Sequence, residues 1–223
     1  AYTNIALDPF PGLAMASDDD TDRAGRLRAR ASAHDEASVI CATFGGALRA
    51  LQAGTTCIID AHGSPGFVDG STQRLREVLL TIGLRAMVGY RVSSGEGDKA
   101  RNAAIEATRS AAIYGGSEQM RFGVNAGTLL EVADHDLSQL AAIVAETESP
   151  FSAEIGIAEG EAKESKKRFK AGPVDRLEKA GLLGPQTVLR VGPWIDEKDA
   201  QRVADSGAVQ VCCPATDLVA HTP

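Results

Sequence analysis

Four histidines are the side chains best suited to bind a metal or to transfer protons near neutral pH: His34, His62, His135 and His221. Metal-binding histidines often stand in pairs such as H-x-H or H-E-x-x-H, and these four do not form such a pair. Only His62 comes directly after a predicted strand, at residues 55–60. The spacing therefore predicts no histidine metal site and singles out His62 as the histidine at a strand end.

Cysteine chemistry is the next candidate, and the four cysteines are Cys41, Cys57, Cys212 and Cys213. They have no C-x-x-C spacing, which disfavours a zinc ribbon or a disulfide framework. Cys57 lies within the apolar run of residues 55–59 and is expected to be a small buried side chain. A nucleophilic pair of Cys213 and His62 is an alternative, although no spacing indicates that the two meet.

Composition excludes several other classes of protein. The formal net charge of −7 argues against a nucleic-acid surface, which would need a basic patch. The 43% hydrophobic content is enough for a full core, and the 4% aromatic content predicts an aliphatic one. We see no apolar run long enough to cross a membrane and no signal peptide, so we expect a cytoplasmic protein.

Short runs rich in Val and Ile alternate with longer segments of helical spacing. Strands are expected at residues 1–7, 55–60, 84–90, 120–125, 151–158, 187–191 and 209–213. Helices are expected at 37–51, 71–82, 98–114, 134–146, 161–180 and 196–205. Ser71 and Asp196 are the predicted caps of their helices, and Gly83 is a predicted helix end. This alternation is typical of a parallel α/β protein.

Two parallel architectures remain, a closed barrel and a doubly wound open sheet. The chain has no G-x-G-x-x-G after an early strand and no G-x-x-x-x-G-K-[ST], which disfavours the nucleotide-binding forms of the open sheet. Seven strand–helix steps with regular crossovers favour a barrel.

Several segments, in the right order, resemble the metal-dependent amidohydrolase superfamily, in its branch of guanine, cytosine and triazine hydrolases. They are AGTTCIID (53–60), AHGSP (61–65), IGLRAMVGY (82–90), IGIAEG (155–160), LEKAGLLGPQTVL (177–189) and VQVCCP (209–214). The resemblance implies a single domain over residues 1–223, a TIM-barrel-like (β/α)₈ fold with about seven βα units and without the usual β-sandwich. It also implies catalytic groups at the carboxyl ends of the strands.

The resemblance further implies where metal ligands would stand. Family members hold one or two divalent metals with an H-x-H pair after the first strand, a histidine on the fifth and sixth strands and an aspartate on the eighth. The matching positions here are Tyr2 and Asn4 for the pair, Gly156 for the fifth strand, and Val191 or, with a shift of one residue, Arg190 for the sixth. No βα unit is expected after Cys213. We therefore predict that the metal cage is lost and that the chain holds no metal or cofactor.

Some functional positions of the family are retained. Glu159 matches the glutamate three residues after the fifth-strand histidine, which is the proton shuttle in deaminase-type members, and Asp60 and His62 match a motif of close relatives. One interpretation is that these residues only cap helices or hold loops. The other is a small-molecule pocket lined by Asp60, His62, Asn125, Glu159 and Arg190.

Two functional hypotheses follow. The first is a catalytically degenerate barrel that acts as a structural or regulatory subunit of a larger assembly, because open barrel edges favour pairing with a second copy or another protein. The second is a hydrolase for C–N bonds of a small cyclic amidine or amide, with either a metal-free site or metal ligands elsewhere. Its acid/base groups would be Glu159, His62 and Asp60. Its substrate contacts would be Arg190, Asn125, Tyr2 and Asn4.

Overall fold

The computed structural model describes residues 2–6, 29, 31–94, 97–114, 116–214 and 217. These residues group into two compact units. The first comprises Ala1–Tyr90 and Glu106–Phe122, and the second comprises Arg91–Ile105 and Gly123–Pro223. Helix α5 (Asp98–Ile113) contributes one part to each unit. The single domain over 1–223 stays a prediction.

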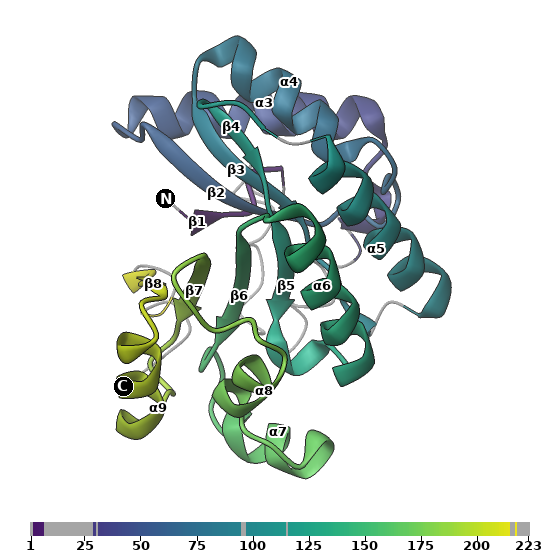
Figure 1. Ribbon diagram of the computed structural model, residues 1–223. Helices are drawn as coiled ribbons and strands as arrows, with labels where there is room; N and C mark the ends of the chain where they lie inside the picture. Colours follow the sequence, from purple (N-terminus) through teal and green to yellow (C-terminus); the bar gives the residue numbers. More distant parts are fainter. Residues whose placement is uncertain are drawn as a thin grey trace. The chain divides into compact units, whose positions relative to one another are not determined.

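The first unit contains a four-stranded parallel sheet (Figure 1). Its strands follow the chain order β1 (Tyr2–Thr3), β2 (Cys57–His62), β3 (Arg85–Tyr90) and β4 (Met120–Phe122). Helices α3 (Glu36–Gln52) and α4 (Ser71–Ile82) pack against each other, and α4 packs on β3. Parallel strands require long crossovers, and these helices supply them.

Alternate residues of each strand point to one face, and in the first unit that face is the core. Ile58 of β2 and Val88 of β3 are fully buried. They cluster with Val39 of α3 and with Leu75 and Leu79 of α4. This aliphatic core agrees with the low aromatic content of the chain.

The second unit contains another four-stranded parallel sheet. Its strands are β5 (Val124–Thr128), β6 (Phe151–Ile155), β7 (Thr187–Val191) and β8 (Val209–Val211), again in chain order. The short helix η3 (Leu129–Glu131) and α6 (Asp134–Thr147) both contact β5. After β6 come α7 (Glu161–Phe169) and α8 (Pro173–Lys179), and α9 (Glu197–Asp205) contacts α8 (Figure 1).

Several predicted helix ends are confirmed. Gly83 follows α4 with a φ of 84°, a left-handed conformation that favours glycine. The carboxylate of Asp196 accepts a hydrogen bond from the Asp199 amide and caps α9. Ser71 is not the cap of α4, because Gly70 takes that position and Ser71 is the first helical residue.

The sequence placed some element boundaries wrongly. The strand expected at 120–125 is two strands, because β4 pairs with β3 and β5 pairs with β6. The helix expected at 161–180 ends at Phe169 and restarts at Pro173. The cause is local: Lys170 has a φ of 61°, and Pro173 can begin a helix but not continue one. The strand expected at 151–158 ends at Ile155, before Gly156 turns with a φ of 65°.

Cys57 was expected to be buried and is exposed. It is the first residue of β2, and the buried positions of that strand lie farther along it. Strand β2 also extends to His62, so this histidine lies on the strand itself. Within the described part of the chain, no helix is both long enough and apolar enough to cross a membrane.

Candidate functional site

A row of polar side chains occupies one face of the second sheet. Ser152 and Glu154 alternate with the buried Phe151, Ala153 and Ile155 of β6, so they share the opposite face. The strand register places Asn125 of β5 beside Ser152 and Arg190 of β7 beside Glu154. We refer to Asn125, Thr128, Ser152, Glu154 and Arg190 as the Glu154 cluster.

Asn125 is fully buried and tightly held. Its Nδ2 donates to Ser152 Oγ at 2.7 Å, and its Oδ1 accepts from the Gly127 amide at 2.6 Å. The second bond lies at the irregularity of register between β5 and β6. Both ends of the amide are thus used, and this fixes the orientation of the side chain at the strand end.

Glu154 is the titratable group of this cluster. Its Oε2 lies 3.7 Å from Arg190 Nη1 and accepts a long hydrogen bond of 3.4 Å from Thr128 Oγ1. Burial raises the pKa of Glu154, and the positive charges of Arg190 and Arg91 lower it only in part. A carboxyl group with a raised pKa beside a fixed cation can serve in proton transfer.

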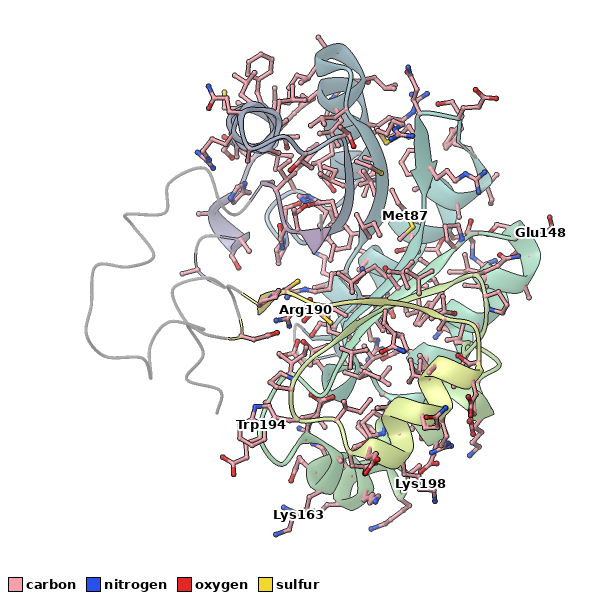
Figure 2. The ribbon with its side chains drawn as sticks, turned by 90° about the vertical axis from the view of Figure 1, so that its left-hand side faces the viewer. Met87, Glu148, Lys163, Arg190, Trp194 and Lys198 are labelled. Carbon is pink, nitrogen blue, oxygen red and sulfur yellow. The ribbon has the colours of Figure 1, made fainter. Side chains whose placement is uncertain are left out.

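Arg190 bridges two carboxylates. Its side chain, which is labelled in Figure 2, is 7% exposed. Its Nη2 donates to Asp217 Oδ1 at 2.8 Å, and its Nη1 lies near Glu154 Oε2. The sequence hypothesis made Arg190 a substrate contact, and a fixed cation would suit an anionic group of the substrate. In this geometry a substrate anion would compete with two carboxylates, so the arrangement favours Arg190 as the residue that positions Glu154.

Glu159, the proton shuttle suggested by the resemblance, lies in an exposed turn before α7. The buried carboxylate of this segment is Glu161, which is 3% exposed. Its Oε2 accepts from the Ile157 amide at 2.8 Å and from the Ala158 amide at 3.5 Å. Glu161 therefore holds the turn that carries Glu159.

Asp60 lies in the first unit and is 1% exposed. Its Oδ1 accepts from the Ile5 amide at 2.6 Å and from Thr3 Oγ1 at 2.8 Å, which ties β1 and the residues after it to β2. Burial raises the pKa of Asp60 to about 6, against the lowering effect of these two hydrogen bonds. Asp60 Oδ2 is buried without a hydrogen-bond partner.

His62 is fully buried at the end of β2. Its Nε2 lies 2.7 Å from Ser64 Oγ, and its ring meets the Tyr90 ring edge-on with centroids 5.6 Å apart. Ser64 Oγ donates to Phe67 O at 2.5 Å, so His62 Nε2 is the donor toward Ser64. These contacts hold the loop between β2 and α4.

The remaining sequence candidates are less informative. Asn4 follows β1, is half-buried and has a buried Oδ1 without a hydrogen-bond partner. The Tyr2 backbone pairs with Ile59, but its side chain lies outside the described residues, as does His221. Of the predicted site residues, the structure brings Asn125 and Arg190 onto one sheet face, whereas Asp60 and His62 belong to the other unit, as does Asn4.

Glu154, Ser152 and Thr128 were missed from the sequence. One signal was present: in the strand sequence Phe151-Ser-Ala-Glu-Ile155, polar residues occupy every second position of an otherwise apolar run. Parallel strands buried on both faces are usually apolar throughout, so such alternation marks a polar face.

No protein-family model matches the chain. The 5′-deoxyadenosine deaminase of Methanopyrus kandleri is 26% identical over 174 residues, which are 77% of this chain and 39% of that protein. The structure of an adenosine deaminase from Xanthomonas campestris with bound zinc has a TM-score of 0.81 and 16% identity, over 97% of this chain and 49% of the other. Guanine deaminase from C. acetobutylicum with bound guanine has a TM-score of 0.81 and 12% identity, over 97% and 54%.

These similar proteins are deaminases of the metal-dependent amidohydrolase family. Their structures confirm the predicted fold class, an α/β fold of parallel strands that matches amidohydrolase barrels. The chain spans about two fifths of the curated relative and about half of each solved structure. All are enzymes that act on C–N bonds, which favours the hydrolase hypothesis over that of a structural or regulatory subunit.

The described donor set does not fit a transition metal. Among these residues, no group of three or more His, Cys, Asp or Glu side chains could hold one. Asn125 uses both atoms of its amide in hydrogen bonds, and Gly156 and Val191 offer no ligating atom. Arg190 brings a positive charge that repels a cation.

Proposed function

We propose that this chain carries the substrate-binding part of a hydrolase that cleaves a C–N bond of a small nitrogen heterocycle, with the Glu154 cluster as its site. The pair of half-buried Glu154 and buried Arg190 carries the proposal, because partial burial raises the pKa of that carboxyl group in spite of the cation beside it. The similar deaminases support it, since each acts on an amino-substituted heterocycle.

The reaction is a hydrolytic deamination. The oxygen of water forms a bond to the ring carbon that bears the amino group, and the C–N bond to that group breaks. Water loses one proton to the Glu154 carboxylate, and the departing nitrogen takes up a proton from Glu154 and leaves as ammonia. Arg190 holds Glu154 in position, and Asn125 donates a hydrogen bond to Ser152 on the same face of the sheet.

Release of ammonia tests this function. The purified chain is incubated with adenosine, 5′-deoxyadenosine, 5′-methylthioadenosine and guanine, with and without added zinc. We expect Glu154→Gln to lose at least about 100-fold in kcat, because an amide cannot take up a proton from water and return it as a carboxylate does. Glu159→Gln is the matched control: Glu159 is exposed, so this variant should keep its activity. Loss of activity in Glu159→Gln and not in Glu154→Gln would restore the assignment suggested by the resemblance.

A second candidate is a chain that binds such a heterocycle without hydrolysing it, as part of a larger assembly. This function is favoured because, among the described residues, no group of three or more His, Cys, Asp or Glu side chains could hold the metal ion that would activate water. A ligand that raises the unfolding temperature without release of ammonia would support this function and refute the first. The protein partner expected from the sequence also stays a proposal, and analytical ultracentrifugation of the purified chain measures it directly.

A further inference from the structure

The carboxyl end of β6 is joined to the segment after β7 by close backbone contacts. The Gly192 amide donates to Ile155 O at 2.9 Å, and the Trp194 amide donates to Gly156 O at 3.0 Å. Gly156 and Gly192 are both buried. We refer to Gly156 together with Gly192–Ile195 as the glycine junction.

Gly156 has no room for a side chain. A Cβ at this position would lie 2.9 Å from the Ile195 amide nitrogen and 3.2 Å from Ile195 Cβ. Its φ of 65° is also unfavourable for any residue with a Cβ. Contact and conformation thus both require glycine at the end of β6.

Gly192 is equally restricted, but only by contact. A Cβ there would overlap the Gly156 carbonyl oxygen and lie 2.7 Å from its carbonyl carbon. The φ of Gly192 is not positive, so no conformational strain adds to the clash. The two glycines therefore let two backbones approach closer than side chains permit.

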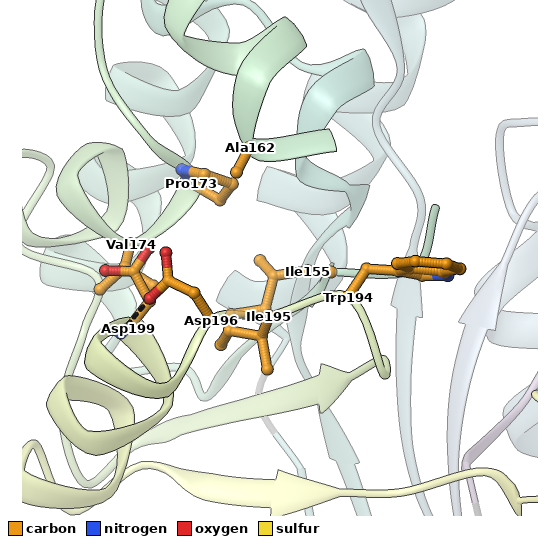
Figure 3. A pocket seen from close by; sticks show the side chains of 9 residues that line it. Ile155, Ala162, Pro173, Val174, Trp194, Ile195, Asp196 and Asp199 are labelled. Atoms are coloured by element: carbon orange, nitrogen blue, oxygen red, sulfur yellow. Dashed lines mark hydrogen bonds between the residues drawn. The ribbon is translucent and has the colours of Figure 1, made fainter. Parts of the chain in front are cut away.

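The space beside the junction is small. Figure 3 shows the pocket lined by Ile155, Pro173, Val174, Ile195 and Asp196, with the Trp194 ring directed away from it. Its volume of about 10 Å³ is near the least that one water molecule needs. No substrate fits here, so close packing and not ligand binding accounts for the shape of this strand end.

We propose that the glycine junction takes the place of a metal ligand at the carboxyl end of β6. It ties β6 to the segment after β7 through backbone contacts, and it leaves no space for a ligating side chain at position 156. A histidine introduced at this position would displace Ile195 before it could bind a metal. The proposal stands independently of the Glu154 cluster and of any activity.

Four glycine-to-alanine variants separate contact from conformation. Gly156→Ala introduces both a steric clash and an unfavourable backbone conformation. Gly181 has a similar φ of 70°, but a Cβ added there would meet no atom within 4 Å. Gly192→Ala introduces only the steric clash, because the φ of Gly192 is not positive. Gly184→Ala is its control, since a Cβ there would lie in open space and the φ of Gly184 is not positive either. Each variant is melted in a calorimeter, and the emission of Trp194, the single tryptophan of the chain, is recorded.

We expect Gly192→Ala to lower the unfolding temperature by about 5 °C or more, and Gly184→Ala to leave it within about 1 °C. Gly156→Ala should lose at least about 5 °C more than Gly181→Ala, and both junction variants should shift the Trp194 emission. The proposal would be overturned if Gly156→Ala and Gly181→Ala lowered the unfolding temperature equally, or if Gly192→Ala changed neither the unfolding temperature nor the Trp194 emission.

A zinc titration completes the test. Gly156→His and the unaltered chain are dialysed against zinc, and bound metal is measured by mass spectrometry together with the unfolding temperature. We expect Gly156→His to bind no more zinc than the unaltered chain and to be less stable. About one additional zinc per chain, with a restored unfolding temperature, would show that the junction opens for a ligand and would refute the proposal.

Discussion

The pH dependence of stability should change when Asp60 is replaced by asparagine. In the folded chain, burial raises the pKa of Asp60 from 3.8 to about 6, in spite of hydrogen bonds from Ile5 and Thr3. Between these two pH values the folded state keeps a proton that the unfolded state has released. Stability therefore falls as the pH rises through this window, and the loss is complete above about pH 6.

The size of this effect follows from the shift. Each pKa unit corresponds to about 1.4 kcal/mol, so ionised Asp60 destabilises the folded chain by roughly 3 kcal/mol relative to its protonated form. Asp60→Asn keeps an oxygen for Ile5 and Thr3 and carries no charge. Its amide group is left without an acceptor at a cost of about 1–3 kcal/mol, but that cost does not depend on pH.

Urea unfolding followed by circular dichroism measures the effect. We expect Asp60→Asn to gain stability relative to the unaltered chain by about 2 kcal/mol of unfolding free energy from pH 4 to pH 7, because a small part of the effect already lies below pH 4. Asp69→Asn, which alters an exposed carboxylate, is the control for general charge effects. If the difference in unfolding free energy does not change with pH, burial does not raise the pKa of Asp60.

Two further variants test the packing of the second unit. Arg176 is 2% exposed, pairs with Asp134, and donates to the carbonyl oxygens of two residues between β5 and α6, so Arg176→Met should cost about 3 kcal/mol in urea unfolding. The exposed Arg168→Met should cost less than about 1 kcal/mol, and equal losses would contradict the role of the buried guanidinium. Asp196→Ala removes the cap of α9 and should lower the unfolding free energy by about 1 kcal/mol, whereas Asp196→Asn keeps an acceptor oxygen and should lower it by only part of that. Equal losses of unfolding free energy in the two variants would show that the hydrogen bond to the Asp199 amide does not stabilise the helix.

Local signals in the sequence were sufficient for most of the secondary structure. Strand 187–191 and helix 71–82 lie where the pattern of apolar residues predicted them. Gly83 and Asp196 act within one turn of the helix that they end or cap, so their effect can be read from neighbouring residues alone. The split of the predicted strand 120–125 was not readable in this way, because it depends on which strands its two halves pair with.

The chemistry of the site depended on contacts between distant segments. Glu154 and Arg190 are 36 positions apart in the sequence and meet because parallel strands β6 and β7 pair in one register. Glu159 was singled out by the resemblance, but the turn that carries it is exposed. The burial that raises the pKa of Asp60 likewise arises only when β1 and β2 come together.

By itself, the sequence determined the parallel α/β class of the fold and the aliphatic core, because these follow from residue type and periodicity. The resemblance implied that Gly156 stands at the position of a metal ligand. Only the tertiary structure decided that Gly156 is closed off by Ile195 and that Glu154 lies beside a buried cation. Close approach and desolvation are properties of three-dimensional packing, and residues far apart in the chain create both.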